Sequence, residues 1–526
     1  MENVKKFLKG IEPREYQREI YETCKTKNCL AVLPTGIGKT LIALMLTIDR
    51  LCKHPDNKVV FLAPTRPLAE QHLNYYQKYL PELFATMELF TGKTPSSKRK
   101  KLWQSADIIF STPQCIANDV KKNLYNLSEV CLLIEDECHR CIKNYSYTYV
   151  ARKYLEQSSN SKILGLTASP GHDKEKIKQI CKHLNVEAVE LRTRESEDVK
   201  PYLQELKFEI IKVDFPEEFK EIYDLLKQIY DKKVDELKNR KLLFGPTTKT
   251  NLLELQRKIM RMISTGNKNF NNLAGASVIA IVIKVQYALE LLETQTLASF
   301  HAYIQDLFEQ AKQGKTKAAV KLVKMPEFNQ AYIKLTELLS KKIEHPKLLK
   351  LKEIVEKEIK SNPKTKIIVF AQFRDTVTKI CKTLNEIPEI LARVFVGQAK
   401  KSTKEGKETG LSQKEQKEII HDFTLGKINI LAATSIGEEG LDIPEVNAVI
   451  FYEPIPSAIR QIQRRGRTAR LEKGKLIILL TRKTRDEAYY WAAFNKEKKM
   501  YKAIDSIQKD FNNNNLSFKD QQKTLE

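Results

Sequence analysis

Residues 34–40 read Pro34-Thr35-Gly36-Ile37-Gly38-Lys39-Thr40 and lie between the apolar run 29–33 and a helical pattern. Glycines let a backbone turn tightly enough to aim N–H groups at phosphate oxygens. Lys39 adds a positive charge and Thr40 a ligand for Mg²⁺. The strict spelling of such a loop would place a glycine at Leu33, so the loop needs support from a second motif. The stretch predicts a loop that binds the phosphates of a nucleoside triphosphate.

A carboxylate pair supplies that support. It follows the apolar run 130–134 and belongs to the tetrapeptide Asp136-Glu137-Cys138-His139. Asp136 can hold the magnesium shell, and Glu137 can orient and deprotonate an attacking water. A glycine-rich turn and a surface acid pair are the alternative. The order of the two motifs, each after a strand-like run, favours a triphosphatase site.

Strand-like runs alternate with helical patterns in two parts of the chain, 1–197 and 346–495. The predicted strands are 29–33, 59–63, 108–111, 130–134 and 163–167 in the first part, and 366–371, 391–396, 428–433, 446–452 and 476–480 in the second. Alternation of this kind predicts a parallel sheet whose ligands gather at the carboxyl ends of the strands. The motifs fall at those ends. We therefore predict two α/β domains of the same architecture.

Residues 198–345 change character. Ile222, Leu226 and Ile229 recur near helical spacing, and strand signals are few after 208–213. We predict an all-helical domain inserted between the two α/β domains. Residues 201–340 contain 21 basic and 17 acidic residues, so their net charge is only +4. Residues 496–526 are predicted to form a terminal helix followed by a disordered tail.

The composition is that of a globular chain with a large positive charge. Hydrophobic residues make up 42%, charged residues 30%, and the net charge of the 526 residues is +24. Such an excess attracts a polyanion by releasing condensed counterions, which makes nucleic acid the natural partner. Acidic proteins, a ribosomal surface or a lysine-rich proteome would give the same bias.

Nothing in the sequence points to a membrane. No apolar run approaches the roughly 18 residues of a membrane helix, and the start, MENVKKFLKG, lacks a signal-like stretch. The nine cysteines lack a framework spacing, which suits reduced thiols in a cytoplasm. Cys138 and Cys141 form a C-x-x-C without a second ligand pair, so we expect structural cysteines rather than a zinc site.

Two runs in the second α/β domain identify its role. One is 433–442, which ends in Gly440-Leu441-Asp442, and the other is Gln463-Arg464-Arg465-Gly466-Arg467-Thr468-Ala469-Arg470. Arg467 and Arg470 stand three apart on one helical face. This spacing suits arginine fingers that reach a triphosphate held by the first domain, where they can supply roughly 10³–10⁵ in rate. A solvated basic face is the alternative.

With these runs the chain resembles the superfamily-two helicases. The motifs occur in the order Arg14-Glu15-Tyr16-Gln17, the phosphate loop, Ala63-Pro64-Thr65-Arg66-Pro67-Leu68, Thr91-Gly92, Ser111-Thr112-Pro113, the Asp136 tetrapeptide, Thr167-Ala168-Ser169-Pro170 and the two later runs. Within the superfamily, residues 410–416, 451–460 and 484–491 are similar to archaeal Hef and the Fanconi anaemia M translocases. The resemblance implies two RecA-like motor domains and a thumb-like insert that binds duplex or branched DNA.

The resemblance also implies a role for each motif residue. ATP would be bound by Arg14, Gln17, residues 34–40, Gly440, Asp442 and Gln463, with Gln17 reading the adenine edge. Catalysis would fall to Lys39, Asp136, Glu137, Arg467 and Arg470, with Mg²⁺ at Thr40 and Asp136. Nucleic acid would be gripped by Thr65, Arg66, Thr91, Gly92, Thr112 and Thr434, although turn capping is an alternative for each threonine.

The implied activity is ATP-driven translocation from 3′ toward 5′ on branched DNA, such as stalled forks and four-way junctions, in DNA repair near the nucleoid. An RNA-directed motor stays open, because RNA-sensing helicases share the tetrapeptide and a helical insert. A junction-binding scaffold with a decayed ATPase is a third interpretation, against which the intact Lys39 and Glu137 speak. A separate nuclease subunit and a sliding clamp, through the tail 521–525, are further candidate partners.

Three positions depart from the family pattern. Cys138 replaces a more frequent alanine, a change between small residues, and Ala469 replaces a frequent glycine. Glu135 stands where an apolar residue is usual, and nothing in the sequence explains it. No E-R-K-x-x-x-D run occurs in the sequence, so nuclease activity is not predicted.

Overall fold

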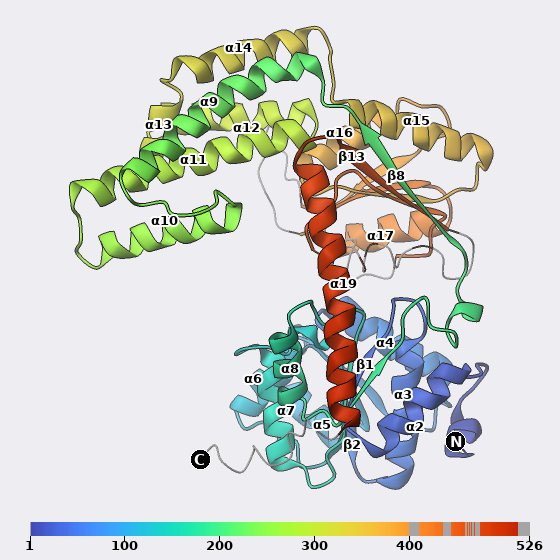
Figure 1. The fold of residues 1–526 in the computed structure, drawn as a ribbon. Coiled ribbons are helices and arrows are strands. Elements are labelled where there is room, and N and C mark those ends of the chain that lie inside the picture. The colour runs from blue at the N-terminus through green and yellow to red at the C-terminus, as the bar shows by residue number, and fades with distance from the viewer. Residues whose placement is uncertain are drawn as a thin grey trace.

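The computed structural model describes residues 2–398, 410–434, 443–457, 460, 462, 464, 468 and 474–513. These residues form two parallel sheets and a helical bundle, with the bundle beside the second sheet (Figure 1). The predicted fold class, two RecA-like domains with a helical insert, is confirmed.

The first domain holds a seven-stranded parallel sheet in the order β3-β4-β2-β5-β6-β1-β7. The strands are β1 Cys29–Val32, β2 Lys58–Leu62, β3 Met87–Phe90, β4 Ile108–Ser111, β5 Val130–Asp136, β6 Ile163–Thr167 and β7 Ala188–Leu191. The five predicted strands are the five inner ones, whose residues are all buried. The two edge strands, β3 and β7, were not predicted, because they are only partly buried and lack a continuous apolar run.

Helices cover both faces of this sheet. They are α1 Glu2–Phe7, α2 Glu15–Thr26, α3 Lys39–Lys53, α4 Arg66–Tyr79, α5 Ser96–Ser105, α6 Pro113–Lys121, α7 Ser146–Gln157 and α8 Lys174–His183, with short 3₁₀ turns at Cys138–Arg140 and Lys200–Tyr202. One core forms against α7 and α8, and the other forms around α3, whose residues 41–51 are all buried. The phosphate loop thus leads directly into the most buried helix of the domain.

The second domain holds a six-stranded sheet in the order β10-β11-β9-β12-β13-β8. Its strands are β8 Leu206–Val213, β9 Ile367–Phe370, β10 Ala392–Phe395, β11 Ile430–Ala433, β12 Ala448–Phe451 and β13 Gly474–Thr481, and its helices include α15 Pro346–Ser361, α16 Arg374–Leu384 and α17 Gln413–Thr424. β8 pairs in parallel with β13 along its whole length. The predicted all-helical segment 198–345 therefore needs a correction, because residues 206–213 form an edge strand of the second sheet.

The insert itself is a bundle of helices. They are α9 Glu217–Asn239, α10 Lys249–Ser264, α11 Phe270–Thr294, α12 Leu297–Lys312, α13 Lys317–Leu322 and α14 Pro326–Ser340. α11 is long and apolar enough to cross a membrane by length and composition alone, which corrects the expectation that no such run exists. However, 61% of its most apolar window is buried inside the protein, where it packs on α9, α10, α12 and α13. Burial in the bundle accounts for its composition.

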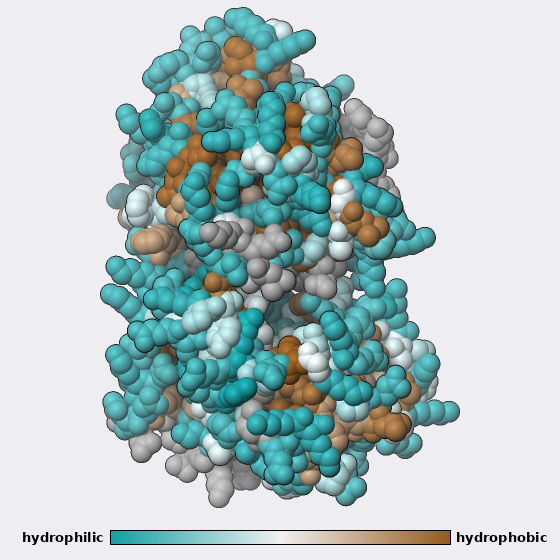
Figure 2. Space-filling view, turned by 90° about the vertical axis from the view of Figure 1, so that its right-hand side faces the viewer, coloured by the Kyte–Doolittle hydropathy of each residue, from teal (hydrophilic) through white to brown (hydrophobic). Residues whose placement is uncertain are grey.

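A long final helix, α19 Arg485–Asn512, runs from the second domain down to the first (Figure 1). Its later buried residues join the first-domain core; they are Met500, Ala503, Ile504, Ile507 and Phe511. The predicted terminal helix is thus the second half of a helix that begins at 485. The tail 521–525 lies outside the described residues. Hydrophilic side chains cover most of the face shown in Figure 2, in line with a chain of 30% charged residues.

Candidate ATP site and nucleic-acid interface

The phosphate loop connects the end of β1 to the start of α3. Gly36 and Gly38 both have φ of 83°, the left-handed region that favours glycine. A Cβ added at Gly38 would lie 2.2 Å from Nε2 of Gln17, so a larger residue would displace the Gln17 amide from its hydrogen bond to Ile37. Lys39 Nζ donates to the carbonyl oxygens of Leu33 and Pro34, at 3.2 and 3.3 Å. The ammonium group therefore lies over the loop, where phosphates would be held.

Gln17 lies under this loop rather than apart from it. The side chain is 2% exposed, and its Nε2 donates to the carbonyl of Ile37 at 3.1 Å. Its Oε1 accepts from the backbone N–H of Arg14 at 2.9 Å. Tyr16, one residue earlier, donates its hydroxyl to the same Ile37 carbonyl at 2.6 Å. In this structure Gln17 positions the loop, and its role in reading adenine stays a prediction.

Asp136 ends β5 beside a histidine that the sequence motifs did not identify. Its Oδ2 lies 2.9 Å from Nε2 of His72, a buried residue of α4 whose ring lies against Phe61. Burial alone would raise the pKa of Asp136, but His72 and Lys39 more than offset this and hold that pKa below its ordinary value. Asp136 is therefore ionised at neutral pH, as a ligand for a divalent cation must be.

Glu137 follows β5 directly and has a left-handed backbone conformation, with φ of 52°, so the chain turns sharply there. Its Oε2 lies 3.1 Å from Nδ1 of His139. The same Nδ1 lies 3.3 Å from Oγ1 of Thr167, the last residue of β6. Thr167 Oγ1 in turn accepts from the backbone N–H of Ser169 at 3.1 Å. The second acid of the pair is thus connected to the neighbouring motif through one imidazole.

The residues present fit a magnesium ion that is bound together with a triphosphate. Thr40 lies in the first turn of α3 and Asp136 ends β5, so one hydroxyl and one ionised carboxylate are available. Among the described residues, no group of three or more His, Cys, Asp or Glu side chains could hold a metal by itself. Mg²⁺ typically takes one or two carboxylates and completes its shell with phosphate oxygens and water. This donor set suits that role.

The second-domain half of the site is described only in part. Ile462, the residue directly before the arginine-rich run, is buried in the first-domain core, and it lines a small cavity of about 60 Å³ together with Pro34 and Thr35. Ile462 therefore lies next to the phosphate loop. The other predicted residues of this half lie outside the described residues: Gly440, Asp442, Gln463, Arg467, Arg470 and, among the departures, Ala469.

The predicted nucleic-acid residues of the first domain follow β2, β3 and β4, which are neighbours in the sheet. Thr65 Oγ1 and Arg66 Nε are buried polar atoms without a hydrogen-bond partner in the described part of the chain. Buried polar atoms are normally satisfied, so these two are available to bind a water or a nucleic-acid backbone. Thr112 stands at the N-cap position of α6.

The Thr91-Gly92 turn is held by a pair that no sequence motif predicted. Arg99 donates its Nε to Oδ2 of Asp119 at 2.6 Å and its Nη1 to the carbonyl of Thr91 at 3.3 Å. Gly92 is exposed, and a Cβ there would meet nothing within 4 Å. In the second domain, Thr434 is buried directly after β11, where its N–H donates to the carbonyl of Phe395 at 3.2 Å.

A phosphate loop and an acid pair at the carboxyl edge of one parallel sheet, with a second parallel sheet beside it, define a motor of the helicase class. Three family models match: DEAD/DEAH box helicase over residues 14–177, a putative ATP-dependent RNA helicase helical bundle over 218–341, and helicase conserved C-terminal domain over 347–472. Their order reproduces the two motor domains and the insert between them.

Individual proteins narrow the class. The crystal structure of the Pyrococcus furiosus Hef helicase domain is 41% identical, with a TM-score of 0.70, and the match covers 91% of this chain and 98% of that chain. A putative ATP-dependent RNA helicase of Methanocaldococcus jannaschii is 40% identical over 95% of this chain, and the ATP-dependent DNA helicase mph1 of Neurospora crassa is 32% identical over 92%. The chain spans 61% and 42% of the lengths of these two relatives. It belongs to the Hef and Fanconi anaemia M family of superfamily-two helicases, as its motifs predict.

Proposed function

We propose that this chain hydrolyses ATP to move along DNA, from 3′ toward 5′, and remodels branched DNA such as forks and four-way junctions. The main support for the proposal is that the ATP site and the predicted nucleic-acid site lie side by side at the same edge of the first sheet. The phosphate loop and acid pair follow β1 and β5, and the unsatisfied atoms of Thr65 and Arg66 follow β2, the strand next to β5. Hydrolysis at one site can therefore act on a backbone held at the other.

The side chains of the chain itself have separate roles in hydrolysis. Lys39 attracts the phosphates, and Thr40 and Asp136 would hold Mg²⁺, which neutralises charge that develops on the phosphoryl group when it is bound. Glu137 orients and deprotonates the attacking water, with its carboxylate held beside His139. We propose Arg467 and Arg470, from the second-domain sequence, as the fingers that stabilise the leaving charge.

The charge of the insert supports a role in binding a polyanion. Residues 238–273, which include α10, contain eight basic residues and one acidic residue, whereas the rest of 201–340 contains 13 basic and 16 acidic residues. The eight are Lys238, Arg240, Lys241, Lys249, Arg257, Lys258, Arg261 and Lys268. α10 forms an outer edge of the bundle (Figure 1). The net charge of the insert is small, but residues 238–273 are strongly basic. We infer that this segment contacts the phosphates of a duplex.

The test compares ATP hydrolysis and strand separation on defined substrates. We expect forked DNA and four-way junctions to stimulate hydrolysis more than linear duplex DNA, and duplex RNA to stimulate it least. Unwinding of duplexes with a single-stranded tail at either end gives the polarity. The Lys39→Ala variant is the control, and it should abolish both hydrolysis and remodelling. Absence of ATP-dependent remodelling of any DNA would overturn the proposal.

An RNA-directed motor is the second candidate. The family model that matches the insert and the Methanocaldococcus jannaschii relative are both described as putative ATP-dependent RNA helicases. The same hydrolysis assay separates the two candidates. Stronger stimulation by duplex RNA than by any forked DNA would replace the DNA proposal with this one.

The remaining expectations are tested in the same experiments. If Lys39→Ala left fork remodelling unchanged, the chain would be a junction-binding scaffold rather than a motor. Given a role in repair, we expect the protein in the cytoplasm, with the nucleoid. Co-purification with the full chain tests for a nuclease subunit or a sliding clamp. The full chain is used because the candidate clamp-binding tail, 521–525, lies outside the described residues.

A further inference from the structure

Two aromatic side chains of α19 lie together outside the core. Trp491 is 53% exposed and Phe494 is 47% exposed, whereas Tyr490 beside them is buried in the second-domain core. The centroids of the Trp491 and Phe494 rings are 5.8 Å apart, and the ring planes meet at 88°. Because the rings are perpendicular, one planar group cannot cover both. Aromatic side chains placed in this way are typical of a surface that binds another molecule.

A cavity of about 330 Å³ opens beside Trp491, between α19 and the second sheet. Its apolar lining comes from Ile210 of β8, Leu480 of β13 and Tyr490. Phe208 and Ile210, two residues apart on one face of the edge strand β8, are exposed as well. The indole ring of Trp491 therefore lies at the mouth of an apolar space that is large enough for a small planar group.

The charges at the rim of this cavity are balanced, but those further along α19 are positive. Lys212 pairs with Glu487 at 3.0 Å, and Arg482 pairs with Asp214 at 3.2 Å. Three exposed lysines follow the aromatic pair, and none of them pairs with an acid in the part of the chain that the structure describes. They are Lys498, Lys499 and Lys502. Positions 491, 498 and 502 share one helical face over about 16 Å. This face of α19 thus places aromatic rings next to a row of positive charge.

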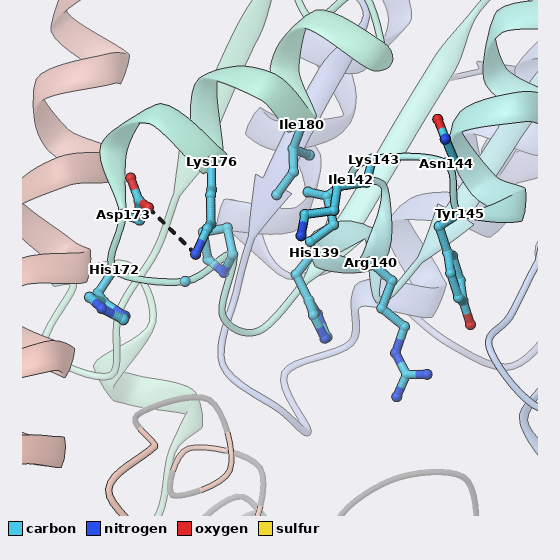
Figure 3. Close-up of a pocket in the computed structure, with 12 residues that line it drawn as sticks. His139, Arg140, Ile142, Lys143, Asn144, Tyr145, His172, Asp173, Lys176 and Ile180 are labelled. Carbon is cyan, nitrogen blue, oxygen red and sulfur yellow. Dashed lines mark ion pairs between the residues drawn. The ribbon is translucent and has the colours of Figure 1, made fainter. Parts of the chain in front are cut away.

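The positive charge continues onto the first domain. His172, which precedes α8, lies beside α19, the faint red helix at the left of Figure 3. Partial burial lowers the pKa of His172, and the charges of Lys496, Lys176 and Lys499 act in the same direction. Asp173 opposes them, but it is paired with Lys176 at 3.5 Å, the dashed line in Figure 3. The potential along this side of α19 is therefore positive and attracts an anion.

This surface is separate from the residues predicted to grip nucleic acid. α19 packs on α8 and on β7, which is one edge strand of the first sheet. The predicted contacts of that domain follow β2, β3 and β4, at and near the opposite edge. In the second sheet, Thr434 follows β11, whereas the cavity lies at β8 and β13, on the other side of the sheet order. The middle of α19 runs between the two domains (Figure 1).

We propose that this face of α19 binds a single strand of nucleic acid, with bases stacked on Trp491 and Phe494 and phosphates along Lys498, Lys499 and Lys502. Every unit of such a strand carries one planar base and one phosphate, which matches rings followed by lysines. A duplex does not match, because its bases are stacked on one another. A strand separated by the motor is the natural occupant; this last step rests on the proposed function, whereas the binding itself does not.

The test uses the fluorescence of the full chain, which has two tryptophans, Trp103 and Trp491. Trp103 is buried and stacked on Tyr125 at 3.9 Å, so a nucleic acid cannot stack on it. We expect an oligothymidylate of about 20 nucleotides, longer than one site, to quench the wild-type emission without ATP. The variant Trp491→Phe should show no quenching. Binding of the same oligonucleotide, labelled with fluorescein, is followed by anisotropy to establish saturation.

Two outcomes of this titration would overturn the proposal. One is unchanged tryptophan emission at a concentration that saturates the anisotropy, since the strand would then be bound elsewhere. The other is equal quenching by a blunt linear duplex of the same length, since the face would then not select a single strand.

Variants of the neighbouring residues test how the strand is held, with Trp491 as the probe. Phe494→Ala should raise the oligonucleotide concentration for half-maximal quenching at least about fivefold, the effect of losing one stacked base. Lys499→Gln and Lys502→Gln should each reduce the slope of log binding constant against log salt by about 0.7. Lys27→Gln, an exposed lysine just before β1, is the control with the same charge change. Values equal to those of the control in all three variants would refute the assigned contacts.

Failure of this site and failure of the proposed function give different results. The titration contains no ATP, so it does not depend on hydrolysis. A chain that shows the quenching but remodels no DNA keeps the site and loses the motor function. A chain that remodels forks while its Trp491 emission stays unchanged keeps the motor function and loses the site.

Discussion

Glu135 is the residue that the sequence left unexplained. It is completely buried in β5, where it pairs with Gly165 of β6, and neither carboxylate oxygen has a hydrogen-bond partner among the described residues. Burial raises its pKa well above the ordinary value. The thiols of Cys138 and Cys141 nearby have raised pKa values for the same reason. The raised pKa favours the neutral form of Glu135, which is how it can stand where an apolar residue is usual.

This state predicts a pH-dependent effect of Glu135→Gln. Because the pKa is higher in the folded chain, the unfolded chain loses its proton first, and wild-type stability falls as pH rises above about 4.5. Glutamine removes this loss. We expect the variant to melt a few degrees higher than the wild type at about pH 8 and at the same temperature near about pH 4. A difference independent of pH would contradict the assignment of a buried proton.

His72 gives a second prediction at this scale. His72 lies 2.9 Å from the Asp136 carboxylate. His72→Ala should therefore weaken Mg²⁺ binding roughly 10- to 100-fold, the usual effect of losing a partner of a metal ligand. The Mg²⁺ concentration for half-maximal ATPase measures this. Tyr76→Phe, one helical turn later in α4, tests whether the effect is general to the helix. An unchanged Mg²⁺ requirement in His72→Ala would show that the contact has no role in binding the ion.

The sequence predicted Lys39, Asp136 and Glu137 because each belongs to a local motif whose chemistry is readable without the fold. His72 and Arg99 were missed because their partners, Asp136 and Asp119, are 64 and 20 residues away. Contacts of that kind arise only when α4 and β5, or α5 and α6, come together. Glu135 was noticed as unusual, but its neutral state depends on burial, which no single position reveals.

At the scale of elements, the junction between the insert and the second domain is held by a buried ion pair. Lys347 and Asp486 are both fully buried, with Nζ and Oδ2 2.8 Å apart. Lys347 also donates to the carbonyl of Thr294 at the end of α11, at 2.6 Å, and Asp486 accepts from the N–H of Thr481 in β13, at 2.9 Å. One ion pair thus joins α11, α15, α19 and the second sheet.

His345 completes this junction. Lys347 donates its backbone N–H to Nδ1 of His345, so the ring proton lies on Nε2, which donates to the carbonyl of Glu293 at 3.2 Å. Burial, followed by the charge of Lys347, lowers the pKa of His345 to about 3, so the ring stays neutral. The last carbonyls of α11 are thereby capped by side chains from the start of the second domain. The insert is fixed to that domain rather than attached by a flexible linker.

The ion pair predicts asymmetric effects of mutation. Asp486→Asn leaves the buried Lys347 ammonium without its counter-charge and should cost about 3–5 kcal/mol. The double variant Lys347→Met/Asp486→Leu removes both charges and should recover most of that loss. Denaturant unfolding of the full chain, followed by helical signal, measures both. A double variant no more stable than Asp486→Asn would show that packing, rather than the unpaired charge, dominates.

The elements themselves were predicted unevenly. Inner strands such as β2 and β9 are continuous apolar runs, because both faces of a parallel sheet are covered by helices, and such runs are visible in the sequence. β8 has a mixed pattern with Phe208 and Ile210 exposed, since it lies at a sheet edge. A strand signal there was noticed, but its partner β13 lies far along the chain, beyond the whole insert. Local pattern cannot assign a strand to one of two sheets.

At the scale of the whole molecule, contacts of α19 and of α17 connect the two motor domains in the described part of the chain, besides the burial of Ile462 in the first-domain core. Ser169 donates its hydroxyl to the sulfur of Met500 at 3.0 Å, and Lys174 pairs with Asp510 at 3.3 Å. Elsewhere, Lys417 of α17 pairs with Glu70 of α4 at 3.2 Å. Ser169 bonds directly to Thr167, and Glu137 is connected to it through His139. The second half of α19 thus contacts the motif that is connected to Glu137, the proposed general base.

Loss of the apolar contacts of α19 should detach its second half. Ile504 and Ile507 are completely buried in the first-domain core, so we expect Ile504→Ala/Ile507→Ala to lower hydrogen-exchange protection over 500–512. Residues 485–495, anchored in the second domain, should keep their protection. Lys498→Ala, at an exposed position of the same helix, is the matched control. Equal loss of protection along all of α19 would mean that the helix is held as a single unit.

Because α19 packs on both motor domains, it also limits how far the two domains can separate. The 28 residues of α19 span about 42 Å at the usual rise per residue. While both ends stay seated, the halves can pivot about this rod, but they cannot slide apart along it. If hydrolysis moves the two domains as proposed, we expect a swing about this helix rather than a separation along it, and the insert, which is fixed to the second domain through Lys347, would swing with that domain.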